Sequence, residues 1–207
     1  ISHQDNDWGL LVFATKQNYR ILQRCDDVYI DGTFKTCPNP YNQFVTIHGK
    51  YRGRVLPLVM CLMTGKLVGQ YRQLLQCVKQ KVRRYTGRRF RPRQIISDFE
   101  NSILTAVETE LRFTHISGCY FHFCQSMWRR IQDLRLARTY RRRGRLRDWV
   151  RKLLAIGYLP LALVRQNFAM HITSNETRRL TNTYPQLREF IQYFNINYMN
   201  PNGRYPP

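Results

Sequence analysis

The stretch Val28-Tyr29-Ile30-Asp31-Gly32-Thr33-Phe34 decides how the rest of the chain is interpreted. Its first three residues favour β-strands, and an unbroken apolar run of this kind is typical of a strand buried on both faces. An aspartate at the end of such a strand is costly to bury unless it is paired or binds a metal. Asp31 is therefore either a turn residue that ends the strand or one member of a charged site.

Strand patterns lie on both sides of this stretch. The runs 41–51 and 55–63 are joined by a short turn that contains Gly53, which predicts an antiparallel hairpin. Together with the opening stretch, they predict an antiparallel meander. The short apolar run 10–14 is a further strand candidate, and residues 16–25 have a spacing close to that of a helix.

The spacing of apolar residues then changes to that of a helix. Between 71 and 82 they recur every three or four positions, which predicts one helix face. A short strand at 94–97, a helix at 101–112 and a strand at 115–120 follow. This order predicts an α/β fold with a mixed five-stranded sheet and flanking helices. From 123 to 200 the sequence contains only helical patterns and loops.

Asp31 and Asp98 each end one of the predicted strands. Because crossover connections are right-handed, the first and fourth strands of the predicted sheet become parallel neighbours, and the two carboxylates face each other. Like charges at this separation favour a bound cation, and hard oxygen ligands suit Mg²⁺, which also accepts phosphate oxygens. The alternative for Asp98 is an N-cap of the helix that follows it.

The charge balance indicates a polyanionic partner. The chain of 207 residues has 34 Lys and Arg against 13 Asp and Glu, a formal net charge of +21. Nucleic acid is the first candidate, although an RNA-packing protein would share this balance. An anionic membrane surface is less favoured, because no Lys-rich amphipathic helix has a clean apolar face. Six cysteines, several within apolar runs, favour reduced thiols and an intracellular compartment.

Two arginine clusters are candidate contacts with this partner. The arginines at 138–151 have a single acidic residue among them, Asp148, which favours contact with a phosphate backbone. The alternative is that they form a solvated helix face. The predicted DNA-binding residues are Arg138, Arg141, Arg142, Arg143, Arg145 and Arg147. Trp128, Tyr140 and Trp149 could stack on bases, but aromatic residues at helical spacing are more often core residues. A second cluster at 83–93 is expected at the end of the sheet away from Asp98, where it would steer a nucleic-acid backbone.

Three motifs, in this order and at these spacings, resemble the transposase domain of Mutator-like elements, the MULE domain. They are Asp31-Gly32-Thr33-Phe34-Lys35, Ser97-Asp98-Phe99-Glu100 and Gly118-Cys119-Tyr120-Phe121-His122-Phe123. The resemblance covers about residues 10–200. It implies a ribonuclease-H-like fold with an Asp-Asp-Glu metal site, and an all-helical insertion between the second aspartate and the glutamate.

The resemblance also implies roles for single residues. Asp31 and Asp98 would be the first two acids and would bind Mg²⁺ or Mn²⁺, while Cys119 and His122 match a Cys-x-x-His signature. Zinc is an alternative for Cys119, His122 and Cys124, but three ligands without a fourth make a poor structural site. Glu100 either assists the metal or is a first-turn helix carboxylate favoured by the helix dipole.

The third acid of the triad is expected beyond Pro207, because in the family it follows the helical insertion and a loop rich in Pro and Arg. Glu176 and Glu189 lie too early in the sequence to serve. We therefore expect a fragment of a longer protein, with an incomplete catalytic core at 1–122, a helical insertion at 123–200 and a linker at 201–207.

The implied activity is metal-dependent cleavage of phosphodiester bonds at transposon ends, followed by strand transfer. The implied partners are terminal-repeat and target DNA, with self-association as a further expectation, and the implied location is the nucleus. The first alternative is a domesticated or inactive transposase-derived protein that binds DNA without catalysis. The second is a protein of the same fold class that binds or cleaves RNA.

Overall fold

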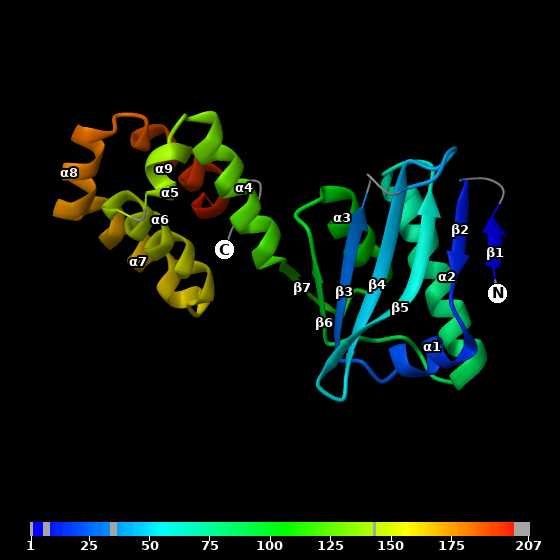
Figure 1. Cartoon of the computed structure of the whole chain (residues 1–207). Helices are drawn as coiled ribbons and strands as arrows, with labels where there is room; N and C mark the ends of the chain where they lie inside the picture. Colours follow the sequence, from blue (N-terminus) through cyan, green and yellow to red (C-terminus); the bar gives the residue numbers. More distant parts are fainter. Residues whose placement is uncertain (1, 6–8, 34–36, 143, 201–207) are drawn as a thin grey trace. The chain divides into compact units, whose positions relative to one another are not determined.

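The computed structural model describes residues 2–5, 9–33, 37–142 and 144–200 (Figure 1). Contacts within the chain divide it into two compact units, Ile1–Cys119 and Tyr120–Pro207, which we call unit 1 and unit 2. The catalytic and insertion roles expected for 1–122 and 123–200 remain predictions. The expected linker at 201–207 lies outside the described residues.

Unit 1 contains a mixed sheet of seven strands in the order β1-β2-β5-β4-β3-β6-β7. The strands are β1 Ser2–Asp5, β2 Leu10–Phe13, β3 Asp27–Thr33, β4 Gln43–Tyr51, β5 Arg54–Met63, β6 Gln94–Ser97 and β7 His115–Gly118. The prediction of five strands was wrong because β2 extends the sheet beyond β5, and β1 extends it beyond β2. The sequence of β1 is Ser-His-Gln-Asp, which has no apolar alternation to indicate a strand.

The pairing of the central strands follows the prediction. β3, β4 and β5 form an antiparallel meander. On its other edge, β3 pairs in parallel with β6, and β6 pairs in parallel with β7. The first and fourth strands of the predicted order are therefore parallel neighbours, as expected from a right-handed crossover.

Three helices, α1 Lys16–Leu22, α2 Val68–Thr86 and α3 Asn101–Glu110, pack with the sheet of unit 1 (Figure 1). One core joins Val28 and Ile30 of β3 to Leu74 of α2 and Ile103 of α3. Gly87 ends α2 at a φ of 71°, a left-handed conformation that glycine adopts without steric cost.

Unit 2 consists of helices and loops over its described residues. The helices are α4 Tyr120–Asp133, α5 Ala137–Arg141, α6 Arg145–Ala155, α7 Leu161–Thr173, α8 Asn175–Thr183 and α9 Leu187–Phe194, with short turns at Ile156–Tyr158 and Asn195–Met199. Trp149, Phe190 and Phe194 are almost fully buried and form its core. In the part of the chain that the structure describes, no helix is both long and apolar enough to cross a membrane.

All six cysteines are free thiols, which agrees with the reduced state predicted for them. Cys25, Cys61 and Cys77 are buried. Burial raises the pKa of the Cys25 thiol to about 11, with a further contribution from the charge of Asp26. These cysteines therefore act as small apolar core residues.

Candidate active site

Parallel pairing brings Asp31 and Asp98 to neighbouring positions at one end of the sheet. Ile30 of β3 lies opposite Ser97 of β6, and the two aspartates are the next residues along the two strands. Asp31 still belongs to β3, while Asp98 follows the last residue of β6. Neighbouring strands lie about 4.8 Å apart, so the backbones of the two aspartates are close. Two carboxylates held this near to each other would repel unless a cation lay between them.

Asp31 itself is exposed, so the prediction of a strand buried on both faces was wrong at this position. Val28 and Ile30 are buried, but Tyr29 is only half-buried, so β3 is not fully buried on both faces. Side chains alternate along a strand, and Asp31 therefore lies on the less buried face together with Tyr29. Its carboxylate carries no large cost of burial and is accessible to a ligand.

His48 of β4 lies close enough to Asp31 for their charges to interact. Asp31 is opposite Thr46 on β4, and His48 follows two residues later on the same face. Burial lowers the pKa of His48, and the negative charge of Asp31 opposes part of this shift. His48 is a neighbour of the site that sequence spacing did not reveal.

A chain of hydrogen bonds leads from the core to the neighbourhood of Asp98. The Gln43 Nε2 atom donates to the Tyr71 hydroxyl at 2.6 Å, and that hydroxyl donates to Glu100 Oε1 at 3.2 Å. Burial, followed by the charge of Asp98, raises the pKa of Glu100, against the effects of Lys66 and of the hydrogen bond from Tyr71. Glu100 thus lies beside Asp98 and is held by a residue of α2.

Gly32 provides the space for this chain of hydrogen bonds. A Cβ atom at Gly32 would overlap the side-chain nitrogen of Gln43. A Cβ atom at Gly118 would likewise overlap the ring of Phe99. The glycines of the first and third motifs therefore make room for side chains on neighbouring elements. Phe34 and Lys35 of the first motif lie outside the described residues.

Cys119 and His122 lie at the end of unit 1 and at the start of unit 2. The Cys119 amide donates to the Ser97 carbonyl at 2.7 Å, which continues the pairing of β6 with β7. His122 is half-buried in the first turn of α4. Across the described residues, no group of three or more His, Cys, Asp or Glu side chains could hold a metal ion. Cys119, His122 and Cys124 therefore do not form such a group, and neither do the carboxylates near Asp98.

The DNA-binding arginines predicted in unit 2 are distributed over two helices and the loop between them. Arg147 is half-buried, and Arg143 lies outside the described residues. The exposed members are Arg138, Arg141, Arg142 and Arg145. Their exposure leaves these four guanidinium groups accessible to phosphate.

The aromatic residues near these arginines have different roles. Trp149 is fully buried, and its Nε1 donates to Thr177 Oγ1 at 2.7 Å, so the core interpretation is confirmed for it. Trp128 is half-buried, with its ring 5.5 Å from Tyr140 and the Arg141 guanidinium 5.4 Å above it. Trp128 therefore packs against Tyr140 and Arg141 of unit 2.

Glu176 and Glu189 both take part in ion pairs within unit 2. Glu176 Oε2 lies 2.9 Å from Lys152 Nζ, and Glu189 Oε2 lies 3.5 Å from an Arg130 nitrogen. Each carboxylate therefore already has a cationic partner within unit 2.

Comparison with known families adds one match. The family model described as the MULE transposase domain matches residues 28–126. No curated protein matches the chain. The matched segment contains Asp31, Asp98, Cys119 and His122, together with β3 to β7. Residues 28–126 are thus similar to the MULE transposase domain, and the resemblance predicted from the three motifs is confirmed over this segment.

Proposed function

We propose that this chain is the core of a DNA transposase of the Mutator-like type, which cleaves phosphodiester bonds with the help of a divalent metal ion. The observation that carries the proposal is the parallel register of β3 and β6, which makes Asp31 and Asp98 neighbours within the segment that matches the MULE transposase domain. The second of these aspartates lies beside Glu100 and the buried hydroxyl of Tyr71.

Two carboxylates, with no third His, Cys, Asp or Glu completing a group among the described residues, are the ligands that this chain offers to a hard divalent cation such as Mg²⁺ or Mn²⁺. Asp31 and Asp98 would hold it, and two carboxylates leave coordination positions for water and for phosphate oxygens. When bound, such an ion stabilises charge on the phosphate and activates the attacking oxygen. Asp31 is exposed, and the hydrogen bond from Tyr71 to Glu100 fixes the position of a carboxylate beside Asp98.

The sheet supports the ribonuclease-H-like fold that the resemblance implies. Five of its strands run in the order β5-β4-β3-β6-β7, with an antiparallel meander on one side of β3 and two parallel strands on the other. Asp31 lies near the end of β3 and Asp98 directly follows β6, so two separate parts of the sequence meet at this end of the parallel pair.

The net charge of +21 supports DNA as the partner. We propose that the exposed arginines of α5, α6 and their connecting loop bind the phosphate backbone of terminal-repeat or target DNA. We also propose that the protein acts in the nucleus and associates with further copies of itself.

Mg²⁺-dependent nicking of terminal-repeat DNA by the full-length protein, which includes the third acid that the resemblance implies, tests the proposal. The wild-type protein is compared with Asp31→Asn and Asp98→Asn, which keep the size of each side chain and remove its charge. Asp133→Asn is the control, because Asp133 is an exposed residue at the end of α4. We expect both site variants to lose nicking and the control to retain it, whereas full nicking by both site variants would refute the assignment.

A DNA-binding protein without catalysis is the second candidate. It is favoured by the net charge of +21 and by the exposed arginines of unit 2, which can bind a phosphate backbone without any contribution from the two aspartates. Such a protein would bind terminal-repeat DNA with equal affinity in the wild type and in both site variants, and none of the three would nick it.

A further inference from the structure

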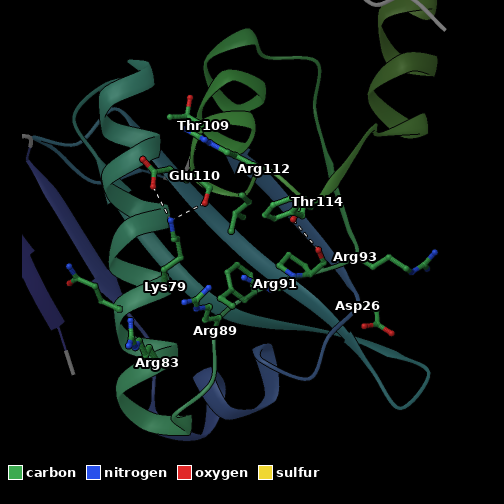
Figure 2. Close-up of a pocket in the computed structure, with 15 residues that line it drawn as sticks. Asp26, Lys79, Arg83, Arg89, Arg91, Arg93, Thr109, Glu110, Arg112 and Thr114 are labelled. Atoms are coloured by element: carbon green, nitrogen blue, oxygen red, sulfur yellow. Dashed lines mark hydrogen bonds and ion pairs between the residues drawn. The ribbon is translucent and has the colours of Figure 1, made fainter.

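A basic pocket of about 650 Å³ lies in unit 1, at the end of the sheet away from Asp31 and Asp98 (Figure 2). It is lined by Asp26, which precedes β3, and by the segments that lead into β6 and β7. β3 and β6 start at this end, whereas the two aspartates lie at their other ends. We define the basic pocket by its six cationic side chains, Lys79, Arg83, Arg89, Arg91, Arg93 and Arg112.

Two of the six cations already have carboxylate partners. Lys79 Nζ lies 3.1 Å from Glu110 Oε2, and Arg93 extends away from the others, 3.0 Å from Asp27 Oδ1 (Figure 2). For the other four, no ion pair with a carboxylate is observed among the described residues. These four are Arg83, Arg89, Arg91 and Arg112, and all are exposed.

Glu110 does not offset the charge of these four arginines. Burial alone would raise its pKa, but hydrogen bonds from Lys79, Gln76 and Arg72 together lower it. The Glu110 carboxylate is thus charged and neutralised locally by Lys79 and Arg72, which lie 3.1 and 3.0 Å from it. Asp26 is the other carboxylate in the lining, and one negative charge against four exposed arginines leaves an excess of positive charge, which favours phosphate.

An exposed aromatic ring lies among these cations. Phe113 lines the pocket and is 88% exposed, the highest value among the exposed large apolar residues of the described chain. The Arg91 guanidinium lies 5.9 Å from the centre of its ring. An exposed aromatic ring beside exposed arginines provides the two contacts that proteins use on single-stranded nucleic acid, stacking on a base and binding of its phosphate.

We propose that the basic pocket binds a single-stranded segment of nucleic acid, with phosphates on Arg89, Arg91 and Arg112 and an unpaired base stacked on Phe113. The proposal rests on the proposed function only for the class of partner, since it requires neither the metal site nor cleavage. It favours a single strand over a duplex, because bases in a duplex are already stacked on each other and leave no face for Phe113.

Binding of a labelled oligothymidylate and of a duplex of equal length to the whole chain, measured by fluorescence anisotropy with EDTA present, tests the proposal. A length of about 12 nucleotides lies within the range of single-strand sites. The pocket variant is Arg89→Ala/Arg91→Ala. The control is Arg165→Ala/Arg188→Ala, which removes the same charge from exposed positions on α7 and α9.

We expect the pocket variant to weaken binding of the single strand more than the control does. The slope of log affinity against log salt should fall by about 0.7 for each phosphate that the variant no longer neutralises. Phe113→Ala should weaken single-strand binding about tenfold and leave duplex binding unchanged, because it removes stacking but no charge. Circular dichroism of each variant verifies that it is folded.

Three results would overturn the proposal. One is an equal decrease in affinity in the pocket variant and the control, which would indicate non-specific electrostatics. Another is an equal effect of Phe113→Ala on single strand and duplex. The third is displacement of the single strand by polyglutamate at an equal concentration of charge, which would indicate an acidic protein partner. None of these results bears on cleavage, so the proposed function is tested separately by the nicking experiment.

Discussion

At the residue scale, Gly32 links the motif around Asp31 to the core. It leaves space for the side chain of Gln43, which is 1% exposed and donates to the hydroxyl of Tyr71. That hydroxyl donates in turn to Glu100, beside Asp98. The glycine after the first aspartate is therefore connected to the surroundings of the second aspartate by two consecutive hydrogen bonds, Gln43 to Tyr71 and Tyr71 to Glu100.

Gly32→Ala should destabilise the protein by about 1–3 kcal/mol, because the new methyl group displaces the Gln43 side chain from Tyr71. Chemical denaturation measures this free energy. In a Gln43→Ala background the same substitution should cost much less, since the overlapping side chain is gone. An equal cost in both backgrounds would contradict the steric explanation.

We predict that His171 of α7 makes the free energy of unfolding of unit 2 depend on pH. Its ring stacks on Trp149 at 4.7 Å between centroids, and its Nε2 lies 3.1 Å from the Trp149 carbonyl oxygen. Burial lowers its pKa, against the raising effect of that hydrogen bond. The unfolded state therefore takes up a proton first as the pH falls, and stability is lost below the unfolded pKa of about 6.5.

Thermal melting at pH values between about 7.5 and 5 tests this direction. His171→Gln, which can still donate to the Trp149 carbonyl, should flatten the decline in melting temperature on acidification. The exposed His115 of unit 1 provides the control substitution, His115→Gln, which should keep the decline. An unchanged decline in His171→Gln would show that other groups cause it.

At the scale of elements, α6 and α4 each present a tryptophan, and the two differ in burial. Trp149 of α6 is fully buried and bonded to Thr177, whereas Trp128 of α4 is half-buried under Arg141. Trp149→Ala should cost about 3–5 kcal/mol of folding free energy, because it leaves a large cavity in the core of unit 2. Trp128→Ala should cost clearly less in the same denaturation measurement, and equal costs would contradict the assignment of Trp149 to the core.

The strands and helices with a strong local pattern could be predicted from sequence. The runs 94–97 and 10–14 became β6 and β2, and the predicted hairpin became β4 and β5. β1 could not be predicted, because its residues are polar and its place is set by pairing with β2. The arginines around 138–151 were predicted as one cluster, but α5 ends at Arg141 and α6 begins at Arg145.

The site was predictable only where it depends on strand order. Asp31 and Asp98 could be paired because a right-handed crossover makes their strands neighbours. Gln43 and Tyr71 could not be found, because they lie on β4 and α2 and meet only through packing of that helix on the sheet. Neither residue belongs to a motif, and their interaction depends on tertiary contacts.

At the scale of the whole molecule, unit 1 separates two chemistries at the two ends of one pair of parallel strands. β3 and β6 lead into the carboxylates Asp31 and Asp98 at one end, and the basic pocket lies where these strands begin. A substrate phosphate near the carboxylates needs a cation, whereas a phosphate in the basic pocket meets arginine directly. Under the two proposals, one nucleic acid would be bound in the basic pocket and cleaved at the two aspartates.

The central claim is that Asp31 and Asp98 together bind a divalent cation. Titration of the chain with Mn²⁺, followed by electron paramagnetic resonance of the free ion, measures this binding without any requirement for cleavage. We predict a site in the wild type that is lost in Asp31→Asn and in Asp98→Asn and retained in Asp133→Asn. Binding of Mn²⁺ to both site variants with wild-type affinity would contradict the claim.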